Sequence, residues 1–356
     1  MGPYLVNPDG KTLRENPNSW NNFASVVYIE APAGVGYSYS SDGNITTSDD
    51  LTAEENYEGL KQFFKKYPNF QNHSTFIIGE SYAGIYVPTL TTKIIENQNN
   101  FPINLKGIAI GNGLVNDAIY RETELKILYG HGFIDEISWQ KFEKTCCNSC
   151  VDTCDLNNLP ENCINLVVRH DLSVNPYNIY GTCDSDKKAN LRETFFNRNL
   201  LMMTKSKNGV KSYIPCFNDT DITTYMNQKN VRKALHIPVK LPEWNICTHL
   251  HYQGQYSDMT PFYKKIYAAK IPMLLYYGDT DLMCNFLMGQ KFSAQLGFPI
   301  IEHEKAWKFN GQVGGFKTVY DGLTFTTIRG AGHMAPQWRA PETAYAIKQF
   351  VSNQPI

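Results

Sequence analysis

The sequence predicts an α/β fold, in which a mostly parallel central sheet is interrupted by a helical insertion that bears disulfides. Short aliphatic runs, each followed by a glycine or turn and then by polar or helical sequence, are typical of a parallel sheet. A helical pattern lies between the first two runs, which is the order of a βαβ unit. A cysteine-rich stretch then breaks the alternation, and a strand pattern resumes after it.

The predicted strands are runs of β-branched and aliphatic residues at 25–29, 75–78, 108–110, 272–277 and 323–328. Over residues 50–66, apolar residues approximate helical spacing, namely Leu51, Tyr57, Leu60, Phe63 and Phe64. Asp49 or Asp50 is expected to cap this helix, and Pro68 to end it. A second helix is predicted over 85–95.

The alternation is lost between residues 117 and 226, where cysteines cluster and polar residues become frequent. We predict a discontinuous core of residues 1–116 and 227–356, with residues 117–226 as a cap insertion on it. Because the strand pattern resumes after the insertion, we expect the insertion to cover the core and not to form an independent domain.

The overall charge gives no indication of a polyanionic partner. The chain has 356 residues, and 33 Lys and Arg against 34 Asp and Glu give it a net charge of -1. No basic patch for nucleic acid or an anionic membrane surface is expected. No apolar run approaches the ~20 residues of a membrane span. We therefore expect a small molecule or a peptide as the partner.

Cysteine usage indicates an oxidising compartment. The chain has nine cysteines, several of them packed between residues 146 and 163. A zinc site would need paired ligands at regular spacing, and Cys147 and Cys150 find only a loose match downstream. Disulfides are therefore favoured over a metal site, and with them a secreted or organellar location. Candidate glycosylation sites in Asn-x-Ser/Thr sequons are Asn44, Asn72 and Asn218.

The segment from Thr75 to Gly84 has the pattern of a nucleophile elbow. An apolar strand ends in Gly79-Glu80-Ser81-Tyr82-Ala83, and a helical pattern follows. A sharp strand-to-helix turn projects the serine hydroxyl and requires small residues two positions to either side. Gly79 and Ala83 meet that requirement, so Ser81 is the candidate nucleophile.

A serine nucleophile requires a base and an acid that orients the base. His333 follows the predicted strand at 323–328 within Gly-Ala-Gly-His-Met, and Asp279 and Asp281 follow the strand at 272–277. Residues after parallel strands meet at one edge of the sheet. The chain order Ser, Asp, His is that of the α/β-hydrolase fold. Spacing alone leaves open which aspartate acts.

These motifs resemble the serine carboxypeptidases, nearest the cathepsin A and carboxypeptidase Y type, over nearly the whole chain. The resemblance implies that Asp281 is the triad acid and that the Tyr82 amide is an oxyanion donor. It also implies that Glu80 binds the terminal carboxylate of a peptide, through a proton shared with a second acid, and that acidic pH is favoured. The motifs are Gly79-Glu80-Ser81-Tyr82-Ala83-Gly84, Gly278-Asp279-Thr280-Asp281 and Gly330-Ala331-Gly332-His333-Met334.

The same resemblance implies disulfides between Cys183 and Cys216 and between Cys146 and Cys163, with Cys147 bridged to Cys150 or Cys154. In the family, a segment with an oxyanion amide and the first strands of the sheet precede the position of Gly2-Pro3. We therefore expect an N-terminally truncated chain whose first strands are missing.

The expected activity is release of C-terminal residues from peptides with a free terminal carboxylate, through an acyl-enzyme on Ser81 and without a cofactor or metal. The alternatives are a catalytically impaired or protective binding protein on the same scaffold, and a carboxypeptidase-like acyltransferase. The expected location is the secretory pathway, either lysosomal or extracellular. A homodimer is compatible with the sequence.

Overall fold

The computed structural model describes residues 1–156, 158–167, 174–183, 216–248 and 250–356. Its main sheet has six strands in the order β4-β5-β7-β10-β9-β8. The predicted strands are confirmed as β4 (Thr75–Glu80), β5 (Leu105–Gly111), β7 (Met273–Gly278) and β10 (Leu323–Ile328). These four run parallel to one another, and β9 (Gln312–Tyr320) and β8 (Ile300–Phe309) add an antiparallel hairpin. The prediction of an α/β-hydrolase fold with a mostly parallel sheet is confirmed.

The strand predicted at 25–29 is wrong, since residues 25–30 have no strand structure. Val27, Tyr28 and Ile29 are 50%, 59% and 46% exposed. A strand is stabilised by its neighbours in a sheet, and no strand among the described residues pairs with this one. The aliphatic composition of this run was therefore not sufficient to specify a strand.

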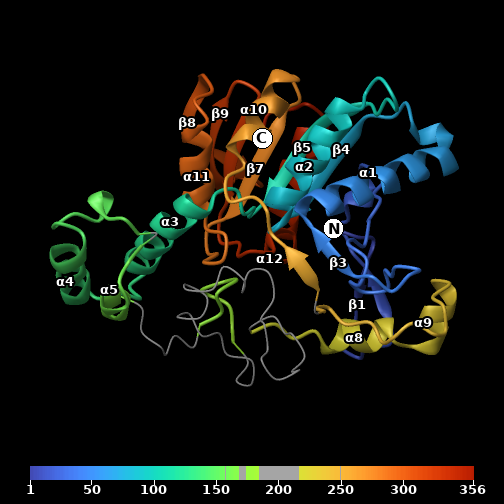
Figure 1. Ribbon diagram of the computed structural model, residues 1–356, viewed down its shortest axis with the longest axis horizontal. Coiled ribbons are helices and arrows are strands. Elements are labelled where there is room, and N and C mark those ends of the chain that lie inside the picture. Colours follow the sequence, from blue (N-terminus) through green and yellow to red (C-terminus); the bar gives the residue numbers. More distant parts are fainter. Residues whose placement is uncertain (157, 168–173, 184–215, 249) are drawn as a thin grey trace.

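The two predicted helices are confirmed as α1 (Asp49–Lys66) and α2 (Ala83–Glu96), which lie together on one side of β4 and β5 (Figure 1). The end of α1 before Pro68 is confirmed, but the predicted N-cap is wrong. Ser48 caps the helix by accepting a hydrogen bond from the Leu51 amide, and Asp49 and Asp50 form the first turn. Carboxylates in the first turn are favoured by the helix dipole, which explains why either aspartate resembled a cap.

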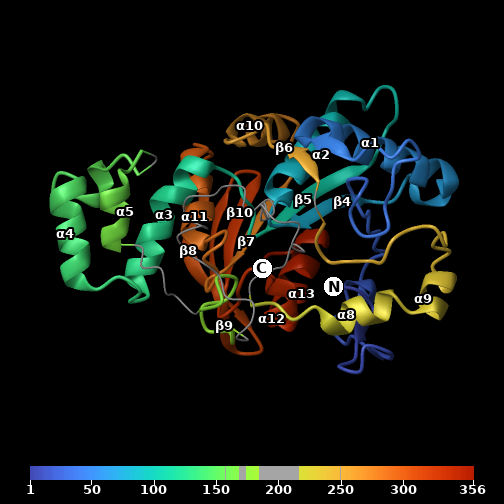
Figure 2. The ribbon, with the colours of Figure 1, turned by 60° about the horizontal axis from the view of Figure 1, so that its bottom comes forward.

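The core lies on both faces of the sheet because residues alternate along each buried strand. Met273, Leu275 and Tyr277 pack with α2, α10 (Thr260–Ala268) and α11 (Phe286–Gln295) on one face. Leu274 and Tyr276 pack with α13 (Ala340–Val351) on the other. Figure 2 shows β4 and β5 between α2 and α13.

A second apolar cluster lies mostly outside the sheet and reaches Leu282 in the loop after β7. It is formed by the end of α3 (Asp117–Gly130), α4 (Glu136–Cys146) and α5 (Glu161–Val167), which project to one side in Figure 1. Ile119 and Tyr120, near the start of α3, still pack in the sheet core, whereas Leu125 and Leu128 belong to the second cluster. One helix thus enters both clusters, and the boundary at residue 117 stays a prediction.

Three disulfides join Cys146 to Cys163, Cys147 to Cys154 and Cys183 to Cys216. Of the two partners left open for Cys147, the structure selects Cys154. The bridges Cys146–Cys163 and Cys147–Cys154 join the end of α4 to the segment that contains α5. The second cluster is therefore cross-linked by covalent bonds.

The remaining elements are short. They are β1 (Tyr4–Val6), β2 (Leu13–Glu15), β3 (Thr46–Ser48), β6 (His251–Gln253), α8 (Thr220–Met226), α9 (Lys229–Ala234), α12 (Ala335–Trp338) and the 3-10 turns Trp20–Asn22, Pro68–Phe70 and Val151–Thr153. The parallel pairing of β3 with β6 brings the chain around residue 252 to the start of α1. No helix in the described part of the chain is long and apolar enough to cross a membrane.

Candidate active site

The candidate site lies at the edge of the sheet where the parallel strands β4, β5, β7 and β10 end. Ser81 follows β4, Asn112 follows β5, Asp281 follows β7 and His333 follows β10. The strand order therefore brings together residues that are far apart in the sequence, as expected for the carboxyl ends of a parallel sheet.

Ser81 lies in a strained turn, with a φ of 64° that L-residues rarely adopt. Its amide donates to the Gly111 carbonyl, and its own carbonyl accepts from the amides of Gly84 and Leu114. The turn also requires small neighbours, because a Cβ at Gly79 would lie 2.3 Å from that of Ala83. These contacts hold the serine at the end of the strand, as a nucleophile elbow requires.

Asp281 and His333 form a buried pair. Their side chains are joined by a hydrogen bond of 2.7 Å between His333 Nδ1 and Asp281 Oδ2, and the two residues are 1% and 3% exposed. The carboxylate also accepts from the amides of Met283 and Cys284. Asp279 instead accepts from the Gly330 amide. Of the two candidate aspartates, it is Asp281 that contacts the imidazole.

The pair makes the imidazole more basic. Burial by itself lowers the pKa of His333, but the charge of Asp281, its hydrogen bond and the charge of Glu80 act in the opposite direction, and the net pKa is raised. With Nδ1 donating to Asp281, Nε2 is the nitrogen available to accept a proton. In the described part of the chain, no hydrogen bond joins the Ser81 hydroxyl to His333. That contact is commonly long in unliganded sites.

Asn112 is a site residue that sequence reasoning missed. Its Nδ2 donates to Asp281 Oδ2 over 2.9 Å, and its Oδ1 accepts from the Gly278 amide over 2.8 Å. The side chain is fully buried. The available signal was a Gly-Asn-Gly sequence directly after the predicted strand at 108–110, at the same sheet edge as the other residues.

Glu80 is the last residue of β4, and its carboxyl group lies close enough to the pair to interact with the charges of His333 and Asp281. Burial raises the pKa of Glu80 to about 7, with His333 acting in the opposite direction and Asp281 in the same direction. Its Oε2 is buried, with no hydrogen-bond partner among the described residues. A carboxyl group of this kind is protonated at acidic pH and can then donate a hydrogen bond.

Tyr82 presents a backbone amide beside the serine and a side chain that is bonded elsewhere. No acceptor for its amide is present in the described structure. Its hydroxyl donates to Asp49 Oδ1 over 2.7 Å, as does the hydroxyl of Tyr252. Asp49 is fully buried and also accepts from the Gln255 and Tyr256 amides. The carboxylate thus fixes the tyrosine ring and leaves its amide available.

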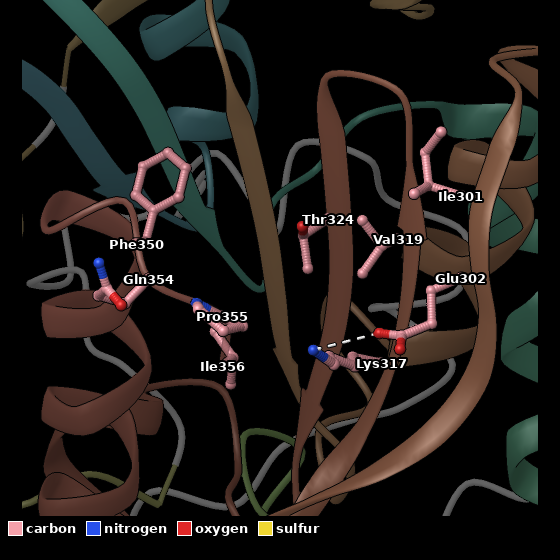
Figure 3. A pocket seen from close by; sticks show the side chains of 9 residues that line it. All are labelled: Ile301, Glu302, Lys317, Val319, Thr324, Phe350, Gln354, Pro355 and Ile356. Atoms are coloured by element: carbon pink, nitrogen blue, oxygen red, sulfur yellow. Dashed lines mark ion pairs between the residues drawn. The ribbon is translucent and has the colours of Figure 1, made fainter.

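A cavity of about 350 Å³ lies between the end of α13 and the β8–β10 strands (Figure 3). Lys317 lines it and forms an ion pair of 3.3 Å with Glu302. The candidate site residues at the ends of the parallel strands do not line this cavity; these are Ser81, Asn112, Asp281 and His333. It contains no candidate nucleophile and base, so it is not the candidate active site.

In the described part of the chain, no cluster of three potential metal ligands is present.

Comparison with known proteins supports the same assignment. Residues 1–353 match the model of the serine carboxypeptidase family. This chain belongs to the serine carboxypeptidase family. It is 35% identical to serine carboxypeptidase ctsa-4.1 of Caenorhabditis elegans and 36% identical to the lysosomal protective protein of Mus musculus. Each match covers 99% of this chain and 80% of the relative.

A solved structure shares the fold of this serine carboxypeptidase. The chain superposes with a TM-score of 0.75 on Kex1(delta)p, described as a prohormone-processing carboxypeptidase from Saccharomyces cerevisiae. The match covers 99% of this chain and 78% of the other at 20% identity, and it therefore supports the architecture alone. Family membership identifies the chain as a hydrolase of the serine carboxypeptidase type.

Proposed function

We propose that this chain releases C-terminal residues from peptides through an acyl-enzyme on Ser81, with His333 as general base and Asp281 as the acid that orients it. The observation that supports this most directly is the buried Asp281–His333 hydrogen bond of 2.7 Å. It lies at the same sheet edge as a serine with a φ of 64°. No other histidine in the described residues forms an ion pair with a carboxylate.

In the proposed reaction, Ser81 Oγ attacks the scissile carbonyl while His333 Nε2 accepts its proton. The imidazolium is stabilised by Asp281 and then returns the proton to the leaving amine. Water then gives a proton to His333 and attacks the acyl carbon, the bond to Ser81 Oγ breaks, Oγ takes the proton from His333, and the shortened peptide acid is released. The Tyr82 amide donates to the oxyanion of the tetrahedral intermediate, a type of contact worth about 100- to 1000-fold in rate.

The proposed specificity for a free C-terminus rests on Glu80. When protonated, its carboxyl group donates a hydrogen bond to the carboxylate of the peptide, and when ionised it repels that carboxylate. Because burial raises the pKa of Glu80 to about 7, the binding-competent form predominates at acidic pH. This favours a compartment such as the lysosome, to which the name of the murine relative, the lysosomal protective protein, refers.

We further propose that the chain enters the secretory pathway and is glycosylated at Asn44, Asn72 and Asn218, all of which are exposed. Three disulfides agree with an oxidising compartment. Digestion with an N-glycosidase should increase electrophoretic mobility, and replacement of each asparagine by Gln should remove one step of that shift.

The function is tested with a fluorophosphonate probe and a blocked dipeptide. We expect the probe to label Ser81, the Ser81→Ala variant to lose labelling and turnover, and a C-terminally amidated peptide to be a poor substrate. Absence of labelling in the folded protein would contradict the proposal and favour a non-catalytic binding protein. Transfer of the acyl group to an added alcohol in preference to water would identify an acyltransferase.

A further inference from the structure

A short segment of the predicted insertion, residues 174–183, lies directly on the loops that hold Asp281 and His333. The Tyr177 carbonyl accepts the His333 amide over 2.7 Å. The same segment bonds to both chain neighbours of Asp281: the Ile179 amide donates to the Thr280 carbonyl, and the Leu282 amide donates to the Pro176 carbonyl. The segment therefore bonds to the backbone on both sides of Asp281 and to the backbone of His333 itself.

Side chains reinforce these backbone bonds. The Thr280 hydroxyl donates to Asn178 Oδ1 over 3.0 Å. The Tyr177 ring packs against the His333 imidazole in an edge-to-face geometry, with ring centroids 5.1 Å apart. An edge-to-face contact restricts the rotation of the imidazole about its own side-chain bonds. The ring is thus held by Asp281 through a hydrogen bond and by Tyr177 through packing.

The approach of the two segments is close enough to constrain the sequence on the other side. A Cβ at Gly332 would lie 2.2 Å from the Tyr177 carbonyl and 2.6 Å from Asn178 Cβ. Since real side chains do not tolerate such distances, glycine is required before His333 for the segment to dock. The requirement for glycine at position 332 shows that the two segments are in tight van der Waals contact.

The segment is also preorganised by its own bonds. The Tyr177 and Tyr180 amides donate to the side chains of Asn175 and Asn178, respectively. The Gly181 amide donates to the Asn178 carbonyl over 2.7 Å. Cys183 at its end is joined to Cys216. Asn175, Asn178 and Ile179 are buried.

We infer that Tyr177 and Asn178, within residues 174–183, are positioning residues that hold His333 and the Asp281 loop in register. This inference rests on the proposed function of the triad. It assigns to the insertion a direct role in setting the geometry of the base, in addition to covering the core. A small displacement of a base from its reactive geometry costs about 100-fold in rate, which sets the scale of the expected effects.

The test compares the Tyr177→Ala, Tyr177→Phe and Asn178→Ala variants, with Tyr180→Ala as control because its side chain is 76% exposed. Rates are normalised to the Ser81 sites that a fluorophosphonate labels. We expect Tyr177→Ala and Asn178→Ala to lower kcat by about 10- to 100-fold with KM within about threefold. Tyr177→Phe, which keeps the ring, and Tyr180→Ala should retain the parental kcat.

A second readout does not depend on turnover. A hydrogen bond between an imidazole Nδ1–H and a carboxylate gives a far-downfield proton resonance, which should broaden or shift in Tyr177→Ala and stay unchanged in Tyr180→Ala. Parental kcat and an unchanged resonance in Tyr177→Ala, even with a lowered melting temperature, would overturn the inference. If instead Ser81→Ala retains activity, the proposed function itself fails, so the two failures can be told apart.

Discussion

Asn112 shows how a single neutral side chain can hold a catalytic carboxylate in place. The Asp281 Oδ2 atom accepts from His333, from the Cys284 amide and from Asn112 Nδ2. Only the asparagine lies at the end of β5, so it links the ends of two neighbouring strands. A buried carboxylate that lost this donor would rotate or attract a compensating water.

We predict that Asn112→Ala lowers kcat by about tenfold and the free energy of unfolding by ~1–3 kcal/mol, because the buried Gly278 amide also loses its acceptor. Steady-state kinetics and urea unfolding measure the two effects. Asn100→Ala, at an exposed position, is the matched control. Parental kcat in a folded Asn112→Ala variant would contradict the role given to this residue.

Glu80 gives a prediction about pH. Its pKa of about 7 in the folded protein means that the carboxyl is neutral at pH 5 and ionised at pH 8. The KM for a peptide with a free carboxylate should rise by about 5- to 10-fold between pH 6 and pH 8, because ionised Glu80 repels it. In Glu80→Gln, which stays neutral, KM should be flat over this range. The amidated peptide is the control, and a parental KM for the free acid that does not change with pH would refute the role of Glu80.

At the scale of elements, the close approach of α2 to the loop after β5 fixes the elbow. Gly84, in the first turn of α2, faces the Leu114 backbone, and a Cβ there would lie 2.3 Å from the Leu114 carbonyl oxygen. The Leu114 amide in turn donates to the Ser81 carbonyl. Glycine at position 84 thus allows α2 to approach the loop after β5, whose Leu114 amide supports the turn at Ser81.

We predict that Gly84→Ala lowers the free energy of unfolding by ~1–3 kcal/mol through overpacking and reduces Ser81 labelling. Gly59→Ala is the control, and its expected effect on the free energy of unfolding has the opposite sign. Gly59 lies inside α1, with nothing within 4 Å of the added Cβ, and this change should raise stability by ~0.5–1 kcal/mol. Chemical denaturation of both variants compares them. Equal effects of the two changes would mean that packing against Leu114 is unimportant.

At the scale of the whole molecule, buried carboxyl groups make stability depend on pH. Burial raises the pKa of Glu124 to about 8, although the nearby Tyr120 hydroxyl and the charge of Arg121 act in the opposite direction. Both Glu124 and Glu80 have folded-state pKa values above the ordinary 4.5. The folded state therefore binds more protons than the unfolded state from about pH 4.5 up to those values, and stability falls as pH rises through that window.

We predict a melting temperature that is higher at pH 5 than at pH 8, with each group contributing a slope of up to ~1.4 kcal/mol per pH unit within its window. Glu124→Gln should flatten the curve between pH 5 and pH 8, because its side chain does not titrate. Thermal unfolding across this range measures both curves. A melting temperature that rises from pH 5 to pH 8 in the parent would contradict the linkage.

Local patterns predicted those parts of the fold that local physics controls. The strands at 108–110, 272–277 and 323–328 are almost entirely buried, and the strand at 75–78 is half-buried at the end of the sheet, so their aliphatic composition indicated them correctly. Strand β8 was missed because most of its residues are exposed and many are charged. The run at 25–29 was overpredicted because composition does not reveal whether a partner strand is present.

By itself, the sequence determined the four parallel strands, the helices α1 and α2, the turn at Ser81 and the placement of Asp281 and His333 after strands, since these depend on residues that are close in the chain. Only the tertiary structure decided that Asn112 bonds to Asp281, that Cys154 pairs with Cys147 and that residues 174–183 dock on both triad loops. Those contacts join residues far apart in sequence or choose between equivalent partners. Their geometry is set by how the strands and the insertion pack together, which no local pattern encodes.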